Sequence, residues 1–147
     1  MSKVTVEIEI RASRETVFDA MLDPARLSEW VTIHKKVNST DSGPPREGFC
    51  MVQTLVLRGA PFKVRWSLTQ YERPGEATWE GRGPGGSYAR TAYRLTERDG
   101  ATRFEYLNEY KAPGGVLGAA ASRALVGGTS EREARRSLER LKALLER

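Results

Sequence analysis

Apolar and polar side chains alternate without interruption from Phe62 to Thr69, which is the pattern of a β-strand with one buried face. The same alternation recurs along much of the chain between Gly48 and Lys111. We therefore expect antiparallel strands over 3–11, 48–58, 62–71, 77–82, 87–97 and 101–111, with a weaker strand within 31–40. Leu107 is apolar on a face expected to be polar, so a β-bulge there would shift the orientation of the residues that follow it.

Turn residues separate these strands. Asp99-Gly100 predicts a tight hairpin, and turns are also expected at 59–61, 73–76 and 83–86. The glycine-rich 83–86 segment joins two strands and lacks the Lys-Ser/Thr ending of a phosphate loop, so it is not interpreted as a nucleotide site.

Helical spacing appears near both ends of the chain. Ser13 is positioned to cap a helix over 14–21, and Pro24 begins a second short helix with Leu27 and Trp30 facing inward. Together with the strands, these elements predict an α+β fold.

The C-terminal region predicts a long helix. Residues 116–126 are small and apolar, and Gly127-Gly128 interrupts the helix or provides the hinge of a lid. Ser130 and Glu133 predict a capping box where the helix resumes. Its apolar stripe consists of Ala134, Leu138, Leu141 and Leu145. We expect one domain over 1–147, a curved antiparallel sheet of about seven strands wrapped around this helix, with two short helices after the first strand.

Charge and composition narrow the possible partners. The net charge is +5, but basic and acidic residues alternate between Arg94 and Glu109, which is typical of charge pairs on a solvated sheet face rather than of a nucleic-acid site. No apolar run approaches the about 20 residues of a membrane span, and the N-terminus shows no signal-peptide pattern. Cys50 is the only cysteine, so we expect a cytoplasmic protein without internal disulfides and interpret this thiol as packed.

Four segments carry a resemblance to a known family. They are IRASRETVF at 10–18, DPARLSEW at 23–30, EYKAPGG at 109–115 and SLERLK at 137–142. These segments resemble motifs of the START/Bet v superfamily (SRPBCC), in its bacterial branch of polyketide cyclases and lipid-transport proteins. The resemblance covers essentially the whole chain and implies a helix-grip fold with an apolar molecule held between helix and sheet. Because that superfamily includes carriers, cyclases, hydrolases and hormone receptors, the resemblance implies a ligand cavity and not a particular reaction.

Strand parity predicts which side chains would face such a cavity, because alternate residues of a strand share a face. The candidates combine large apolar side chains with a few hydroxyl and amide groups, as ligand sites do. The expected ligand-binding residues are Trp30, Met51, Gln53, Leu55, Val64, Trp66, Leu68, Trp79, Thr91, Tyr93, Tyr106, Asn108, Tyr110, Leu117, Ala121 and Leu125. The alternative interpretation is a filled core whose polar atoms satisfy one another, with Trp66 and Trp79 as its walls.

Candidate catalytic residues are fewer. Tyr93, Asn108, Tyr110 and His34 carry groups that can donate or accept a proton. His34 is the sole histidine and has no evident titratable partner in the sequence, so a surface or structural role is the simpler interpretation. One histidine and one cysteine supply few metal ligands, and we expect neither a metal nor a cofactor.

Three functions remain open. The first is binding or transport of a small hydrophobic ligand, such as a lipid or polyketide, by a monomer or homodimer. The second is a polyketide cyclase/dehydrase-type enzyme acting on such a ligand. The third is a protein-interaction module that uses the arginine-bearing outer sheet or residues 132–136.

Overall fold

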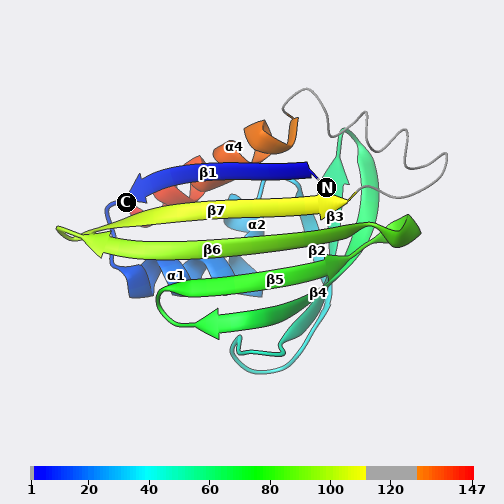
Figure 1. Ribbon diagram of the computed structural model, residues 1–147, viewed down its shortest axis with the longest axis horizontal. Helices are drawn as coiled ribbons and strands as arrows, with labels where there is room; N and C mark the ends of the chain where they lie inside the picture. The colour runs from blue at the N-terminus through cyan, green and yellow to red at the C-terminus, as the bar shows by residue number, and fades with distance from the viewer. Residues whose placement is uncertain (1, 112–128) are drawn as a thin grey trace.

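The computed structural model describes residues 2–111 and 129–147, and these contain a seven-stranded antiparallel sheet. The strands are β1 (Ser2–Ile10), β2 (His34–Thr40), β3 (Cys50–Leu57), β4 (Ala60–Glu72), β5 (Glu76–Arg82), β6 (Tyr88–Arg98) and β7 (Ala101–Lys111). They lie in the order β1-β7-β6-β5-β4-β3-β2, so the first strand pairs with the last. The predicted α+β class and curved sheet are confirmed, and Figure 1 shows the sheet curling around the helices.

The described helices are α1 (Arg14–Leu22), α2 (Leu27–Trp30) and α4 (Thr129–Leu145), with short 3-10 turns η1 (Pro24–Arg26) and η2 (Pro84–Gly86). Helix α1 begins where the sequence indicates, and the second helix expected from Pro24 is divided into η1, which begins at Pro24, and α2. The Ser13 hydroxyl accepts a hydrogen bond from the Thr16 backbone N–H at 3.2 Å, and the Asp23 carboxylate accepts one from the Ala25 N–H at 3.0 Å. These bonds satisfy backbone donors that have no partner within the first helical turn.

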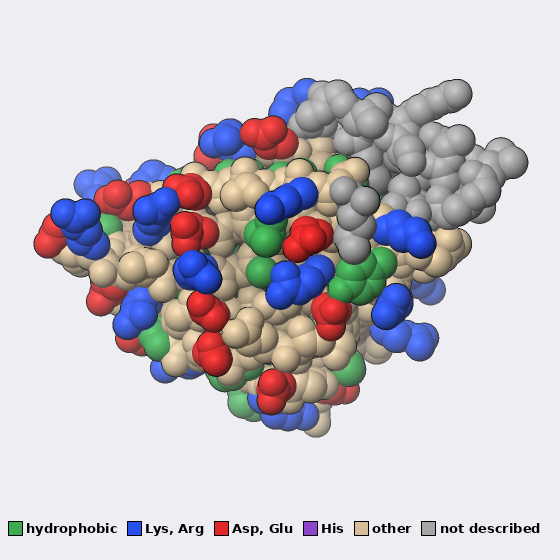
Figure 2. All heavy atoms as spheres, in the orientation of Figure 1, with side chains coloured by type: hydrophobic (Ala, Val, Ile, Leu, Met, Phe, Trp, Pro, Cys, Tyr) green, Lys and Arg blue, Asp and Glu red, His purple; other side chains and the backbone are tan. Residues whose placement is uncertain are grey.

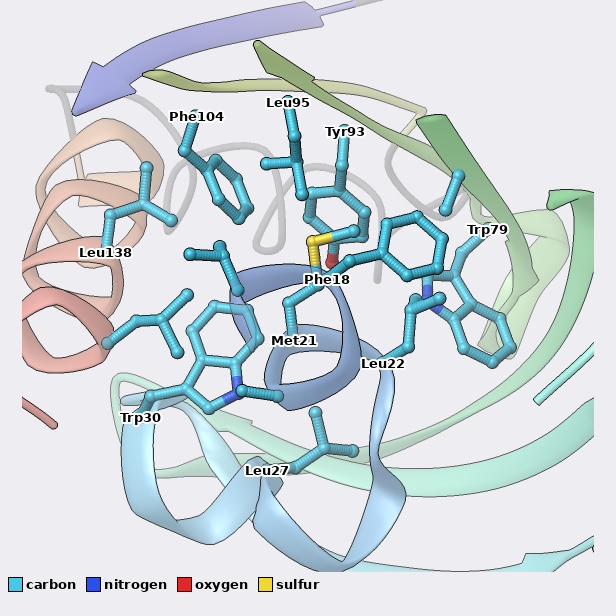
Figure 3. Packing of buried hydrophobic residues seen from close by; sticks show 14 of the residues in the cluster. Phe18, Met21, Leu22, Leu27, Trp30, Trp79, Tyr93, Leu95, Phe104 and Leu138 are labelled. Atoms are coloured by element: carbon cyan, nitrogen blue, oxygen red, sulfur yellow. The ribbon is translucent and has the colours of Figure 1, made fainter. Parts of the chain in front are cut away.

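The core lies between the concave face of the sheet and the three helices. Leu138 and Leu141 of the predicted α4 stripe are completely or almost completely buried, and α4 packs against β1 and α2. In Figure 3, Leu138 of α4, Phe104 of β7 and Met21 of α1 all point into the core. The Tyr93 and Phe104 rings meet edge to face with their centroids 5.4 Å apart.

The outer face of the sheet carries the predicted charge pairs. Arg103 lies 2.8 Å from Glu7, and Arg94 lies 3.3 Å from Glu76 on the neighbouring strand. Figure 2 shows basic and acidic side chains interspersed over this face without a single-sign stripe. Such exposed pairs contribute little to stability, so their main effect is to keep this face solvated.

Four local predictions were wrong. The β3–β4 turn is formed by Arg58 and Gly59, both at positive φ (51° and 79°), and β4 begins at Ala60. The register of β7 with both neighbours is unbroken, so no bulge occurs at Leu107. Cys50 is exposed rather than packed.

The fourth concerns the capping box of α4. Ser130 lies inside the helix, and the Glu133 carboxylate accepts a hydrogen bond from the Thr32 hydroxyl. The partner of Glu133 is therefore far away in sequence, which a local motif does not reveal. The helix expected at 116–126 and the interruption at Gly127-Gly128 lie outside the described residues.

Candidate functional site

A cavity of about 540 Å³ lies between the concave face of the sheet and helices α1, α2 and α4. Its volume falls within the roughly 300–1,000 Å³ that is usual for small-molecule sites. Strands β3 to β7 supply one wall, and Met21, Leu22 and Trp30 contribute from the helices. The curl of the sheet and the position of α4 therefore enclose a space that the protein's described side chains do not fill.

Most of the residues expected to bind ligand line this cavity. They come from five strands and one helix, and parity placed the strand residues on the same face: Trp30, Met51, Gln53, Leu55, Val64, Trp66, Trp79, Thr91, Tyr93, Tyr106, Asn108 and Tyr110. Their position follows from the register of β3 to β7, whose one irregularity, between Leu68 and Gln70 of β4, lies beyond these residues. Their binding of a ligand stays a prediction.

Two expected residues lie elsewhere. Leu68 shares the inward face of β4 but is completely buried in the core and does not border the cavity formed by the described residues. Three residues further along β4, the Tyr71 ring packs against Phe18 of α1 at a centroid distance of 5.4 Å. His34 does not line the cavity either, because it begins edge strand β2 and lies behind Gln53. Leu117, Ala121 and Leu125 are outside the described residues.

Other cavity residues were missed by the sequence analysis. Helices α1 and α4 contribute Met21, Leu22, Glu133, Ala134 and Ser137, the β5–β6 connection contributes Pro84 and Ser87, and the start of β4 contributes Pro61. The apolar spacing of α1 and α4 indicated the buried face of each helix. For the turn residues no periodic signal exists, because their position depends on how far the sheet curls.

Two cross-strand pairs form a polar stripe on the β6–β7 part of the wall. Thr91 lies opposite Asn108, and Tyr93 lies opposite Tyr106. The Thr91 hydroxyl donates to the Asn108 side-chain oxygen at 3.2 Å, and the two tyrosine rings have their centroids 5.9 Å apart. We call these four residues the β6–β7 stripe.

The tyrosines of the stripe stay neutral at physiological pH. Burial raises the pKa of Tyr106 to about 12 and raises the pKa of Tyr93 further above its ordinary value. Neither hydroxyl hydrogen-bonds to another described residue, and Figure 3 shows the Tyr93 oxygen directed into the interior. Both phenols are therefore hydrogen-bond donors available to a molecule in the cavity.

Gln53 on β3 is held between two rings. The Trp66 indole N–H donates to Gln53 Oε1 at 2.9 Å, and Gln53 Nε2 lies 2.8 Å from His34 Nδ1. Because an indole nitrogen can only donate, the amide orientation is fixed, and Nε2 must donate to an unprotonated Nδ1. Desolvation by burial lowers the pKa of His34, which favours this neutral form.

A second polar cluster joins α4 to the segment after α2. The Thr32 backbone N–H donates to the Ser137 hydroxyl at 3.0 Å, and the Thr32 hydroxyl donates to the Glu133 carboxylate. Glu133 also lies 3.5 Å from Arg136. Among the described cavity residues Glu133 is the one carboxylate, and it is already engaged by these groups.

The described residues contain no group of three or more His, Cys, Asp or Glu side chains placed to hold a metal ion.

None of the described helices is long and apolar enough to cross a membrane.

A curved antiparallel sheet closed by a C-terminal helix around a largely apolar cavity defines a helix-grip protein. The chain belongs to the family described as polyketide cyclase / dehydrase and lipid transport, whose model matches residues 1–146. The resemblance inferred from the sequence is therefore confirmed at the level of family and fold.

Individual relatives are more distant. The chain is 26% identical over 129 residues to the uncharacterized protein Rv1546 of Mycobacterium tuberculosis, covering 86% of this chain and 90% of that protein. It is 28% identical over 86 residues to a protein named toxin Rv0910 from the same organism, covering 58% of this chain and 60% of that protein. A crystal structure of protein CV1439 from Chromobacterium violaceum matches with a TM-score of 0.76 and 17% identity, covering 100% of this chain and 99% of that one. At this identity the structural likeness concerns the fold alone.

Proposed function

We propose that the protein binds or transports a small hydrophobic ligand, such as a lipid or polyketide, in the cavity between the sheet and α4. The observation that carries this proposal is the 540 Å³ cavity, walled mainly by apolar side chains with a few hydroxyl and amide groups. Membership of a family described by polyketide chemistry and lipid transport supports it. Burial of an apolar ligand against these walls would supply the driving force.

The tryptophans give a direct assay. The chain has three, Trp30, Trp66 and Trp79, and all of them line the cavity. A ligand entering the cavity therefore changes the environment of every tryptophan, so intrinsic fluorescence should respond to binding. Titration with a panel of fatty acids, isoprenoids and aromatic polyketides, followed by native mass spectrometry of the complexes, tests the proposal.

A matched pair of helix variants locates the binding. Ala134 of α4 lines the cavity, whereas Ala143 on the same helix is exposed. We expect Ala134→Phe to fill part of the cavity and weaken binding about tenfold or more, and Ala143→Phe to leave it unchanged. If no member of the panel alters the fluorescence or is retained in native mass spectrometry, the proposal is overturned.

A polyketide cyclase/dehydrase-type reaction is the second candidate. It is favoured by the adjacent neutral phenols of Tyr93 and Tyr106, which can donate to a carbonyl oxygen as negative charge develops on it. It requires a base as well, and Glu133 and His34 are both engaged in hydrogen bonds. Incubation with an enolisable poly-β-ketone distinguishes the two functions: recovery of the unchanged ligand supports binding, and a cyclised or dehydrated product lost in Tyr93→Phe, Asn108→Ala, Tyr110→Phe or His34→Gln supports catalysis.

We also propose a cytoplasmic protein that acts as a monomer or homodimer without a cofactor. The lone, exposed, unpaired Cys50 supports a reducing compartment. Light scattering after size-exclusion chromatography under reducing conditions measures the oligomeric state, and a larger assembly would contradict this assignment.

A further inference from the structure

Along the sheet wall of the cavity, the polar groups are concentrated on β6 and β7. The β6–β7 stripe carries two hydroxyl-bearing rings, a threonine and an amide, whereas the β3–β4 part of the wall carries Met51, Leu55 and Val64. Gln53 is the polar exception on that part of the wall, and its side-chain amide is already hydrogen-bonded to His34 and Trp66. On the sheet wall a ligand therefore meets hydrogen-bonding groups on β6 and β7 and mostly apolar surface on β3 and β4.

The polar groups of the β6–β7 stripe that have no hydrogen-bond partner among the described residues are hydrogen-bond donors. The oxygen of Asn108 already accepts from Thr91, so its NH₂ group remains, together with the hydroxyls of Tyr93 and Tyr106. A buried donor left without a partner is costly, and an apolar ligand that displaced water from the stripe without replacing its hydrogen bonds would bind weakly. Hydrogen-bond acceptor atoms on the ligand would pair with these buried donors and so remove the cost of leaving them without a partner.

The stripe is also uncharged. Of the described cavity residues only Lys111 and Glu133 carry charge, and Glu133 is bonded to Thr32. Lys111 ends β7, three residues beyond Asn108 and five beyond Tyr106, so its Cα atom lies about 10 Å and about 17 Å from theirs along the strand. Its position in the strand has the opposite parity to those two inward-facing residues. A carboxylate or phosphate against the stripe would lie in an apolar cavity without a counter-charge, which is strongly unfavourable.

We infer that the ligand is an apolar molecule bearing neutral carbonyl oxygen, of the ketone, quinone or ester kind, bound with that oxygen against the β6–β7 stripe. This inference rests on the proposed binding function and adds the chemistry that the cavity selects. Tyr93 and Tyr106 face each other across the ladder, so both hydroxyls can reach one carbonyl oxygen or two neighbouring oxygens.

Matched probes test the selection. Fluorene and 9-fluorenone share one ring skeleton and differ by a methylene against a carbonyl, and undecane and 6-undecanone form the same comparison on a chain. Fluorene-9-carboxylate supplies a charged form. Equilibrium dialysis should show each ketone binding about tenfold more tightly than its hydrocarbon, since one hydrogen bond gives about a 2- to 13-fold preference. The carboxylate should bind more weakly than fluorenone.

Variants assign the preference to the stripe. In Tyr93→Phe/Tyr106→Phe the ketone-to-hydrocarbon ratio should fall to within about twofold, whereas Tyr71→Phe, which removes a phenol away from the cavity, should retain the wild-type ratio. Infrared spectra should show the fluorenone C=O stretch at lower frequency in the wild-type complex and a smaller shift in the double variant, a signal that altered folding alone does not produce.

The outcomes separate the two proposals. If both members of a pair bind with equal affinity, or if the double variant keeps the ratio, the inference is overturned and the binding function stands. If none of the probes and no member of the wider ligand panel binds, the binding function and the inference are both overturned.

Discussion

The Nδ1 atom of His34 lies 2.8 Å from the Nε2 atom of Gln53, directly behind the cavity wall. Trp66 fixes the opposite end of the same amide by donating to Oε1 at 2.9 Å. Protonation of His34 would place two donors face to face, and rotation of the amide would then set its NH₂ group against the Trp66 N–H. The sole histidine of the chain therefore supports a cavity residue without touching the cavity.

This arrangement predicts a pH-dependent stability. The folded-state pKa of His34 lies below the ordinary value of 6.5 because burial disfavours the charged ring. In the window between the two pKa values the unfolded chain binds more protons than the folded one. The stabilisation is therefore fully present above pH 6.5 and is lost as the pH falls from 6.5 through the folded-state pKa.

Urea unfolding between pH 5 and 7.5 measures the effect, and the NMR titration of the single imidazole gives its pKa directly. His34→Gln keeps a polar side chain that does not titrate, so its unfolding free energy should lack the step in this window. An imidazole pKa of 6.5 or higher in the folded protein would contradict the assignment.

The second prediction concerns Gly81 on β5, which pairs with Trp66 on β4. A Cβ atom at Gly81 would lie 2.7 Å from the Trp66 ring and 2.7 Å from Val64. Gly81→Ala should lower the free energy of unfolding by about 1–3 kcal/mol through overpacking and shift the tryptophan emission. Gly75→Ala is the control, since its Cβ would have ordinary contacts starting at 3.8 Å. If urea unfolding gave the same stability for both variants, the side chains of Trp66 and Val64 would be able to move aside without cost, and the prediction would be wrong.

The third prediction concerns the junction between α4 and the segment after α2. Ser137 is buried and accepts from the Thr32 backbone N–H at 3.0 Å. Ser137→Ala leaves that donor without this partner and should cost about 1–3 kcal/mol of unfolding free energy. Ser39→Ala on the exposed edge strand should change it by less than about 0.5 kcal/mol. A cost for Ser137→Ala no larger than that of the control would mean that another group satisfies Thr32.

The sequence predicted most of the sheet because alternation is a property of the strand backbone. Tyr93 and Tyr106 were placed on one face by parity alone, and the unbroken β6–β7 ladder keeps them there. The alternation of faces along a strand does not, however, indicate whether an inward side chain is buried in the core or borders the cavity. Leu68 is on the predicted face but is completely buried and does not border the cavity, so it belongs to the core.

Contacts between segments that are distant in the chain could not be predicted from the sequence. Glu133 fits a local capping motif with Ser130, yet its carboxylate meets Thr32, 101 residues away. The bond between His34 and Gln53 depends on how edge strand β2, with its irregular register, pairs with β3. Likewise, Arg58 carries no turn signal, because few residues other than glycine, asparagine and aspartate adopt positive φ.

The last prediction separates the core from the cavity on a single helix. Leu138 and Leu141 of α4 are 1% and 0% exposed, but only Leu138 borders the cavity formed by the described residues. Replacing a buried leucine by alanine costs about 2–5 kcal/mol, and the cost grows with the empty volume that the substitution leaves behind. Leu138 already faces open space on one side and so has fewer packing partners to lose. Leu138→Ala should therefore lie at the low end of this range and Leu141→Ala at the high end.

Binding should respond in the opposite order. Leu138→Ala enlarges the cavity and should raise the affinity for ligands bulkier than those the wild type prefers, whereas Leu141→Ala should leave the preference for ligand size unchanged. Urea unfolding and equilibrium dialysis of a graded series of ketones measure the two effects on the same samples. If Leu138→Ala proved the more destabilising variant and left ligand size preference unaltered, Leu138 would be a core residue with no share in the cavity wall.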